Sequence, residues 1–162
     1  MNGPILGLDL AENLGISVID AQTNKLLFSD SRKLSSGDPQ RRLLNLRALL
    51  IEVIDKYKPV EIAIEDVFLP AKTSRKTPIS LGELRGVARL SAAERNLPVF
   101  FYAPRQIKQA VTGYGNAKKE DIVHWIQSEF AIKVRDDNEA DAISIAWTHI
   151  LMRRFNLIQK QG

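Results

Sequence analysis

The stretch "LGLDLAENLGISVID", residues 6–20, decides how this chain folds, because it places one carboxylate, Asp9, inside an otherwise apolar run. Two short apolar segments separated by a few polar residues are typical of two buried strands joined by a turn. A carboxylate in a buried strand is strongly unfavourable unless it is paired, protonated or bound to a cation. Asp9 is therefore a candidate functional residue, and its partners should be found elsewhere in the sequence.

The composition indicates one domain in a reducing compartment. With 162 residues, of which 44% are hydrophobic, the chain is long enough for one substantial core, and we take residues 1–162 as a single domain. The absence of cysteine excludes disulfides, thiolate metal sites and cysteine nucleophiles. The sequence contains neither an apolar stretch of membrane-spanning length nor a secretory signal pattern, so we expect a cytoplasmic protein that contacts no membrane.

The hydrophobic periodicity predicts a mixed α/β fold. Strands are expected at 5–10, 15–19 and 25–31, and the polar residues 20–24 make the second and third strands an antiparallel hairpin. Asp38 and Pro39 begin an amphipathic helix that ends before Pro59. A strand at 60–68, a loop at 69–78, a helix at 79–96 and a strand at 98–104 follow, and then helices at 105–111, 118–130 and 136–155. Helical crossovers make the later strands parallel, which gives a five-stranded mixed sheet with helices on both faces.

Acidic side chains from three distant segments are expected to meet in this fold. Asp9 lies in the first strand, Glu65 lies near the end of the fourth strand, and Asp141 lies in the last helix, with Asp137 and Asn138 one turn earlier on the same face. In open α/β sheets, functional groups gather at strand ends. Crowded carboxylates repel one another, and oxygen ligands favour Mg²⁺ or Mn²⁺ over zinc. The pattern predicts a divalent-ion site, in which two ions would activate water for phosphodiester hydrolysis.

Two basic clusters accompany the acidic residues. A net charge of +4 is only a mild excess, and either cluster taken alone would be read as a solvated face. Next to a predicted divalent-ion site, they are candidate contacts to the phosphates of a nucleic acid. The clusters contain these residues: Lys72, Arg75 and Lys76 in the first, and Arg105, Lys108, Lys118 and Lys119 in the second.

Five stretches of the chain together resemble one known family. In order, they are "GLDLAENLGISVID", "IAIEDVF", "SLGELRGVA", "YAPRQIKQAVTGYGNAKKEDI" and "DDNEADAISIAWTH". They resemble the RuvC-type Holliday junction resolvases of the RNase H-like superfamily, in a form similar to divergent or phage-encoded members. The resemblance implies a homodimeric, Mg²⁺-dependent endodeoxyribonuclease, with Mn²⁺ able to substitute, that makes paired symmetric nicks in a four-way DNA junction. A branch-migration helicase would be a natural partner, but the sequence does not identify one.

The resemblance also implies roles for individual residues. It places Phe68 where the family uses an aromatic side chain to stack on a base at the opened junction. Lys108 and Lys119 match phosphate-binding lysines, with Lys119 nearest to the reaction. Neither His124 nor His149 matches an acidic position, so we assign no catalytic role to either. Three carboxylates match the family's metal ligands: Asp9, Glu65 and Asp141.

The fourth ligand position departs from the family pattern, because Asn138 stands where Asp or His is common. An amide oxygen can bind a metal but carries no negative charge and cannot act as a base. Either Asn138 is a weak ligand, or Asp137 replaces it, or the chain is a catalytically weakened protein that binds junctions. A further alternative is a nuclease of relaxed specificity that cuts forks, flaps and Y-junctions. The sequence leaves these alternatives open.

Overall fold

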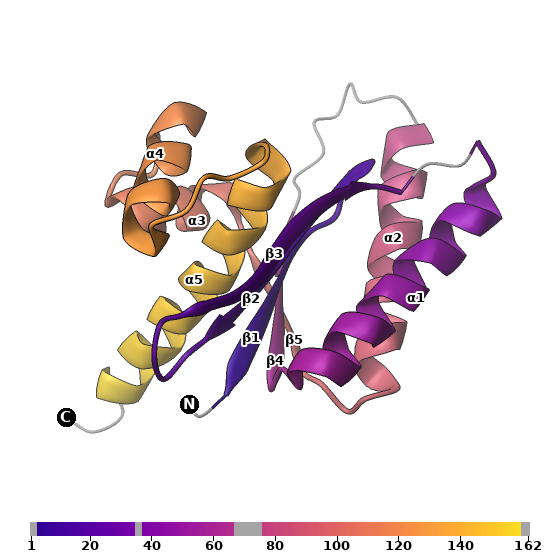
Figure 1. The fold of residues 1–162 in the computed structure, drawn as a ribbon, viewed down its shortest axis with the longest axis horizontal. Coiled ribbons are helices and arrows are strands. Elements are labelled where there is room, and N and C mark those ends of the chain that lie inside the picture. Colours follow the sequence, from indigo (N-terminus) through magenta and orange to yellow (C-terminus); the bar gives the residue numbers. More distant parts are fainter. Residues whose placement is uncertain (1–2, 35–36, 67–75, 160–162) are drawn as a thin grey trace.

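The computed structural model describes residues 3–34, 37–66 and 76–159, which form a five-stranded mixed sheet between two layers of helices (Figure 1). Strands β1 (Pro4–Asp9), β2 (Asn13–Asp20) and β3 (Leu26–Lys33) pair in antiparallel fashion. Strands β4 (Glu61–Glu65) and β5 (Val99–Tyr102) extend the sheet in parallel, giving the order β3-β2-β1-β4-β5. The expected α/β class and the mixed pairing are confirmed.

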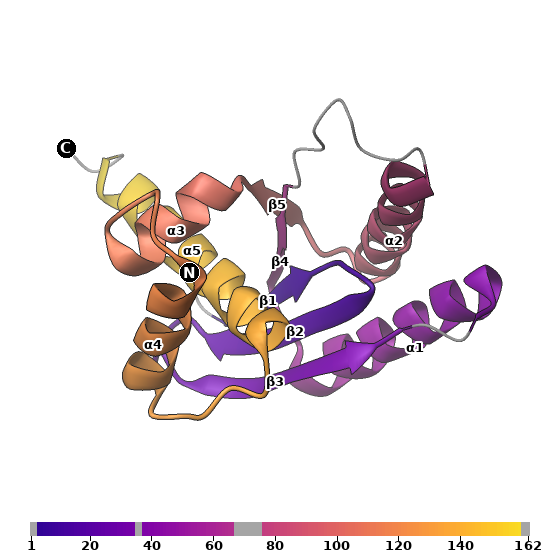
Figure 2. The ribbon, with the colours of Figure 1, turned by 90° about the horizontal axis from the view of Figure 1, so that it is seen from above.

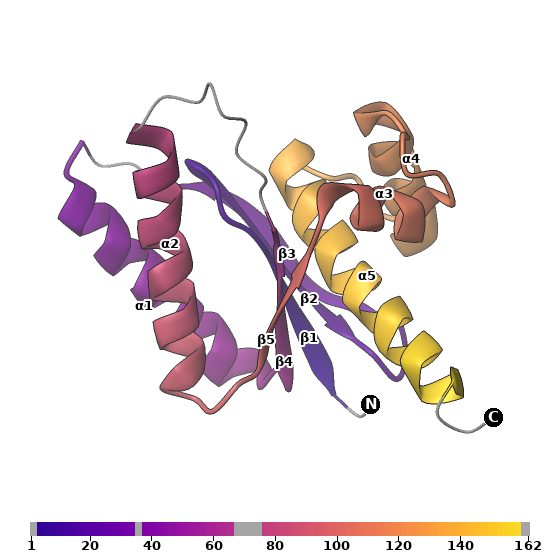
Figure 3. The ribbon, with the colours of Figure 1, turned by 180° about the vertical axis from the view of Figure 1, so that it is seen from behind.

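The five helices cover both faces of the sheet, as Figures 2 and 3 show. One face carries α1 (Pro39–Tyr57) and α2 (Lys76–Ala93), and the other carries α3 (Pro104–Thr112), α4 (Lys119–Phe130) and α5 (Asp137–Gln159). Helix α1 begins as the sequence predicts, with the Asp38 carboxylate accepting the Gln40 N–H at 2.9 Å. Among the described residues, no helix is long and apolar enough to cross a membrane.

The strands supply two hydrophobic cores because successive side chains of a strand point to opposite faces. Leu6 and Leu8 of β1 pack toward α1 and α2, whereas Ile5 packs toward α3, α4 and α5. All three side chains are fully buried. The sheet is thus held from both sides, which fixes the positions of its strand ends.

Helix α5 lies unusually close to the sheet. A Cβ atom at Gly15 would overlap the carbonyl oxygen of Asn138, and one at Gly7 would overlap that of Ala142. The Ser17 hydroxyl donates a hydrogen bond of 2.8 Å to the same Ala142 carbonyl. Glycine is needed at both positions because only a residue without a side chain lets the helix backbone touch the strands.

Several element boundaries differ from those expected. Strand β4 ends at Glu65 instead of continuing to residue 68, because β5, its parallel neighbour, ends at Tyr102 opposite Glu65. Helix α2 already begins at Lys76, within the stretch expected to be a loop. Helix α5 continues to Gln159. The predicted contacts Phe68, Lys72 and Arg75 lie outside the described residues.

Candidate active site

Two of the predicted carboxylates lie side by side at the carboxyl ends of two neighbouring inner strands of the sheet. Strands β1 and β4 are parallel neighbours in which Leu8 lies opposite Ile64. The next residue of each strand is acidic, Asp9 in β1 and Glu65 in β4, so the register makes these two residues neighbours. The parallel pairing brings together two residues that are far apart in the sequence.

The third carboxylate, Asp141, comes from α5. The first turns of this helix lie against β1 and β2 through Gly7 and Gly15, and Asp141 immediately precedes Ala142, whose carbonyl receives the Ser17 hydroxyl. This close packing brings the Asp141 carboxylate within electrostatic range of both Asp9 and Glu65.

Burial raises the pKa of all three carboxylates, and neighbouring negative charge adds to the effect at Asp9 and Glu65. Asp9 is only 8% exposed, and burial, together with the nearby Asp141 and Glu65 carboxylates, raises its pKa to about 7. Burial followed by the Asp141 charge raises the pKa of Glu65, and burial raises that of Asp141. A bound cation would favour the ionised form of these buried carboxylates, so the site is a candidate for cation binding.

Lys119 is the cation that the chain itself brings to this site. As the first residue of α4, it places its Nζ atom 3.2 Å from Asp141 Oδ2 and 3.3 Å from Asp137 Oδ2. Partial burial opposes the charged form, but the two carboxylates outweigh it and raise the pKa of Lys119. The ammonium group is thus held at the edge of the carboxylate site.

A pocket of about 190 Å³ opens beside these groups. Four of its lining residues are charged: Glu65, Lys108, Lys119 and Asp141. The remaining lining residues form an apolar wall from α3, α4 and α5: Pro104, Ile107, Ile122 and Ile145. A pocket with both acidic and basic groups on a rigid apolar wall suits a phosphate accompanied by cations.

The donor set fits a hard divalent cation. All of its side chains offer oxygen, and the buried Asp9 carries a charge that no described basic group contacts directly. Within the described ranges, no three acidic or histidine side chains are close enough to enclose one ion as they stand. Asp141 is paired with Lys119 in this arrangement, so binding of an ion would require the Asp141 carboxylate to exchange one cation for another.

The structure places the remaining predicted residues at different distances from the pocket. Lys108 lines the pocket, whereas Arg105 of α3 is exposed and packs on Gly115. Lys118 is exposed at the N-cap of α4, next to Lys119. Lys76 begins α2, and its side chain lies outside the described residues.

The two candidates for the fourth ligand differ in position. The Asp137 carboxylate is 59% exposed and paired with Lys119, whereas Asn138 is half-buried and its backbone rests on Gly15. The geometry of the helix places both residues in the turn that precedes Asp141.

The sequence analysis missed one ion pair beside the site. Arg85 of α2 donates to the Asp66 carboxylate at 2.8 Å, and its guanidinium lies over the Phe101 ring at 4.6 Å. This pair holds the residue that follows Glu65. The acidic doublet of Glu65 and Asp66 was visible in the sequence, but nothing in the sequence indicated which arginine would pair with it.

His149 is buried and engaged away from the site. Its Nδ1 atom lies 2.7 Å from the Tyr102 hydroxyl and its Nε2 atom lies 2.6 Å from Glu61 Oε2, and Arg153 binds the same carboxylate. This network joins α5 to β4 and β5. It gives His149 a structural role in the core.

Comparisons with known proteins identify the family of this chain. The family model described as crossover junction endodeoxyribonuclease RuvC matches residues 5–149. A curated RuvC from Pseudothermotoga lettingae is 39% identical over 145 residues, covering 86% of this chain and 88% of the relative, and one from Moorella thermoacetica is 36% identical over 151 residues, covering 90% and 89%. The solved structure of Thermus thermophilus RuvC in complex with a Holliday junction substrate superposes with a TM-score of 0.86 at 28% identity, covering 96% of this chain and 97% of that one.

A second solved structure, Thermus thermophilus RuvC, gives a TM-score of 0.84 at 26% identity, covering 94% of this chain and 96% of that one. The family-model match includes β1, β4, the basic segment and the first part of α5. The chain therefore belongs to the RuvC family of crossover junction endodeoxyribonucleases.

Proposed function

We propose that this chain resolves four-way (Holliday) junctions by paired, symmetric hydrolysis of DNA phosphodiester bonds. The observation that carries the proposal is the convergence of Asp9, Glu65 and Asp141 beside the ammonium group of Lys119. The name of the family and the junction complex of the Thermus thermophilus relative supply the substrate class.

We assign the divalent-ion ligands to the three carboxylates, with Mg²⁺ as the expected ion and Mn²⁺ as its substitute. When bound at two neighbouring positions, such ions supply water activation and neutralise charge on the leaving oxygen. Lys119 would bind the scissile phosphate and stabilise the negative charge that develops there. Lys108, across the same pocket, would hold a neighbouring phosphate.

Asn138 is the preferred fourth ligand in this proposal, because it is half-buried where α5 packs on Gly15 of β2, whereas the Asp137 carboxylate is 59% exposed. Base stacking by Phe68 is assigned from the family resemblance. Phosphate binding is assigned to the remaining members of the two basic clusters in the sequence: Lys72, Arg75, Lys76, Arg105 and Lys118. Binding through these cations should weaken steeply with salt, by about 0.9 in log K per tenfold rise in salt for each phosphate neutralised.

A homodimer would supply the second active site that paired nicking requires. Helix α2 offers a face for it, because Ile79, Gly82, Gly86 and Leu90 recur at helical spacing and are exposed. Nothing lies within 4 Å of a Cβ built on either glycine. A second copy of the same helix could therefore approach closely along this face.

Cleavage of branched DNA tests the proposal. An end-labelled four-way junction, a fork and a linear duplex should each be incubated with Mg²⁺, Mn²⁺ or EDTA. Symmetric paired nicks confined to the junction, in the presence of either metal, are expected. Equal cutting of the fork would instead indicate a nuclease of relaxed specificity, and retarded but uncut junction in Mn²⁺ would indicate a binding protein.

Two substitutions distinguish the candidates for the fourth ligand. Asn138→Asp adds a charged ligand, so it should lower the Mg²⁺ concentration needed for half-maximal nicking. Asp137→Asn should leave that concentration nearly unchanged. If Asp137→Asn abolishes nicking while Asn138→Asp has no effect, Asp137 is the ligand.

A further inference from the structure

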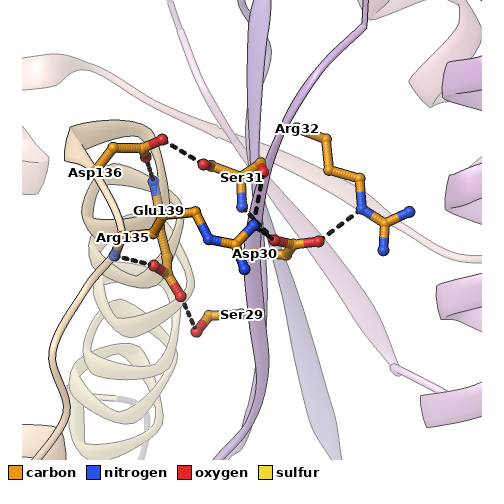
Figure 4. A network of polar contacts seen from close by, with 7 residues as sticks. All are labelled: Ser29, Asp30, Ser31, Arg32, Arg135, Asp136 and Glu139. Carbon is orange, nitrogen blue, oxygen red and sulfur yellow. Dashed lines mark hydrogen bonds and ion pairs between the residues drawn. The ribbon is translucent and has the colours of Figure 1, made fainter.

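A polar network ties the first turn of α5 to the edge strand β3. Of the proposed ligands, Asn138 takes part only through its backbone N–H, which donates to Asp136. The Ser31 hydroxyl donates to the Asp136 carboxylate, and the Ser29 hydroxyl donates to Glu139 Oε1 at 2.6 Å (Figure 4). Ser29 and Ser31 are alternate residues of a strand, so they face the same side and meet two successive anchor points on the helix.

Each of the two carboxylates also caps the helix. Asp136 Oδ1 accepts the Glu139 N–H at 3.0 Å, and Glu139 Oε2 accepts the Arg135 N–H at 2.5 Å. These bonds satisfy backbone donors that have no partner inside the helix. The strand therefore holds the residues that define where the helix begins, and Glu139 is only 8% exposed in this position.

A third link fixes β3 itself. Arg135 Nη1 lies 2.5 Å from Asp30 Oδ1, and Asp30 also accepts the Arg32 guanidinium at 2.6 Å and the Ser31 N–H at 2.9 Å. Asp30 is 7% exposed and hence little able to move. Figure 4 shows the carboxylate between the two arginines.

The network bears on the ion site through the geometry of the helix. Asp137 and Asn138 lie between the anchors Asp136 and Glu139, and Asp141 follows within one turn. A helix turn is rigid, so fixing its start fixes the direction of all three side chains. Mg²⁺ requires near-ideal octahedral geometry and therefore depends on ligands that are held in place.

The network also counteracts electrostatic repulsion between the carboxylates of the site. Asp9, Glu65 and Asp141 carry like charges, and their repulsion pushes α5 away from the strand ends. The glycines at positions 7 and 15 permit the close approach of the helix but do not attract it. The Ser17 bond to the Ala142 carbonyl and the apolar core attract the helix to the sheet, and the hydrogen bonds from β3 add attraction at the helix start.

We propose that Ser29 and Ser31 are positioning residues for the divalent-ion site: by holding Asp136 and Glu139, they set the placement of Asp141 and Asn138 relative to Asp9. The inference rests on the proposed function in that it concerns the same carboxylates, but it assigns a role to side chains that touch neither metal nor DNA.

The double variant Ser29→Ala/Ser31→Ala tests the inference, because it removes both hydroxyl donors without changing any charge. Mn²⁺ binding to the DNA-free protein, followed by the electron paramagnetic resonance signal of free Mn²⁺, should weaken about tenfold. The Mg²⁺ concentration for half-maximal nicking should rise by a similar factor. Junction affinity in EDTA should stay within about twofold of the wild type, because the phosphate-binding lysines are untouched.

Two further variants separate positioning from general stability. The single substitution Ser31→Thr, with Ser29 unchanged, keeps a hydroxyl on a residue type that suits a strand. It should retain nearly the wild-type Mn²⁺ affinity. Ser91→Ala removes a fully buried hydroxyl, which donates to Val87 O at 2.9 Å in α2, and should lower the melting temperature without changing Mn²⁺ affinity. Unchanged Mn²⁺ affinity in the folded double variant, or an equal loss in Ser91→Ala, would overturn the inference.

The readouts keep this inference distinct from the proposed function. Weaker Mn²⁺ binding in the double variant supports the positioning role even if the wild type cuts no junction. If the wild type cuts junctions normally and the double substitution leaves Mn²⁺ affinity unchanged, the positioning role is refuted. The proposed function is then unaffected.

Discussion

The ammonium group of Lys119 and the carboxylate of Asp141 form an ion pair of 3.2 Å that joins the start of α4 to the first turns of α5. Both groups line the same pocket together with Glu65. The chain thus carries a cation of its own at the place where negative charge converges. This arrangement gives Lys119 two partners in turn, the carboxylate in the free protein and the scissile phosphate in the proposed complex.

Lys119→Met should reduce the nicking rate by about 100-fold, because it removes a charge that stabilises the transition state. Junction affinity in EDTA should fall much less, with the salt dependence of log K reduced by about 1. Single-turnover nicking and gel retardation measure the two effects. Lys133→Met is the control, since Lys133 is exposed, lies outside the pocket and has no assigned contact to DNA. Equal loss of nicking rate in both variants would contradict the role of Lys119.

Asp9→Asn should stabilise the metal-free protein while abolishing nicking. The pKa of Asp9 is raised from 3.8 to about 7, so the folded state binds a proton more tightly than the unfolded state between these values. Stability therefore falls as the pH rises through this window, and the full cost is present above pH 7. In EDTA at about pH 8, the variant should gain about 2 to 4 kcal/mol.

Urea unfolding at about pH 8 and about pH 4 checks this prediction for Asp9, since the gain should vanish at the lower pH. Asp20→Asn serves as the control, because Asp20 is exposed and hydrogen bonds from the Thr23 and Gln22 N–H groups lower its pKa. Its replacement should bring no gain. An Asp9→Asn protein that is no more stable than the wild type at the higher pH would refute the proposed crowding of charge.

His149→Gln should destabilise the protein by about 1 to 3 kcal/mol near neutral pH, because Glu61 and Tyr102 lose a buried partner. Burial lowers the pKa of His149 below 6.5, although its bond to Glu61 acts in the opposite direction. The contribution of the neutral imidazole is thus fully present above pH 6.5 and is lost as the pH falls toward the folded-state pKa. The difference in stability between the wild type and His149→Gln should therefore become smaller at acidic pH. A difference in melting temperature that stays constant from about pH 7.5 to about pH 5 would contradict the prediction.

Gly15→Ala should cost about 3 kcal/mol, because the added methyl group meets the Asn138 carbonyl oxygen and must push α5 from the sheet. The same displacement should weaken Mn²⁺ binding. Gly82→Ala is the comparison, since nothing lies within 4 Å of its Cβ position, and it should change stability by less than about 1 kcal/mol. Denaturant unfolding of both variants measures the difference, and similar values for the two would show that α5 is not in close contact with β2.

Local sequence patterns were sufficient for the presence of the elements and for the acidic residues of β1 and β4. The apolar run around Asp9 and the segment ending in Glu65 predicted two buried strands, and Asp38 with Pro39 predicted the start of α1, because alternation and capping depend on residues a few positions apart. The end of β4 at Glu65 was not predictable in this way. It depends on the length of β5, which pairs with it from 37 positions further along the chain, as Glu65 lies opposite Tyr102.

The sequence by itself determined which chemistry this protein carries: carboxylates at Asp9, Glu65 and Asp141, and lysines at 108 and 119, in an order typical of one family. Only the tertiary structure decided how these groups are held. The pairing of Lys119 with Asp141, the hydroxyls of Ser29 and Ser31 on the start of α5, and the burial of His149 against Glu61 join residues from separate elements. Such contacts follow from packing of helices on the sheet, which no local pattern encodes, because many side chains of the same type could have occupied each place.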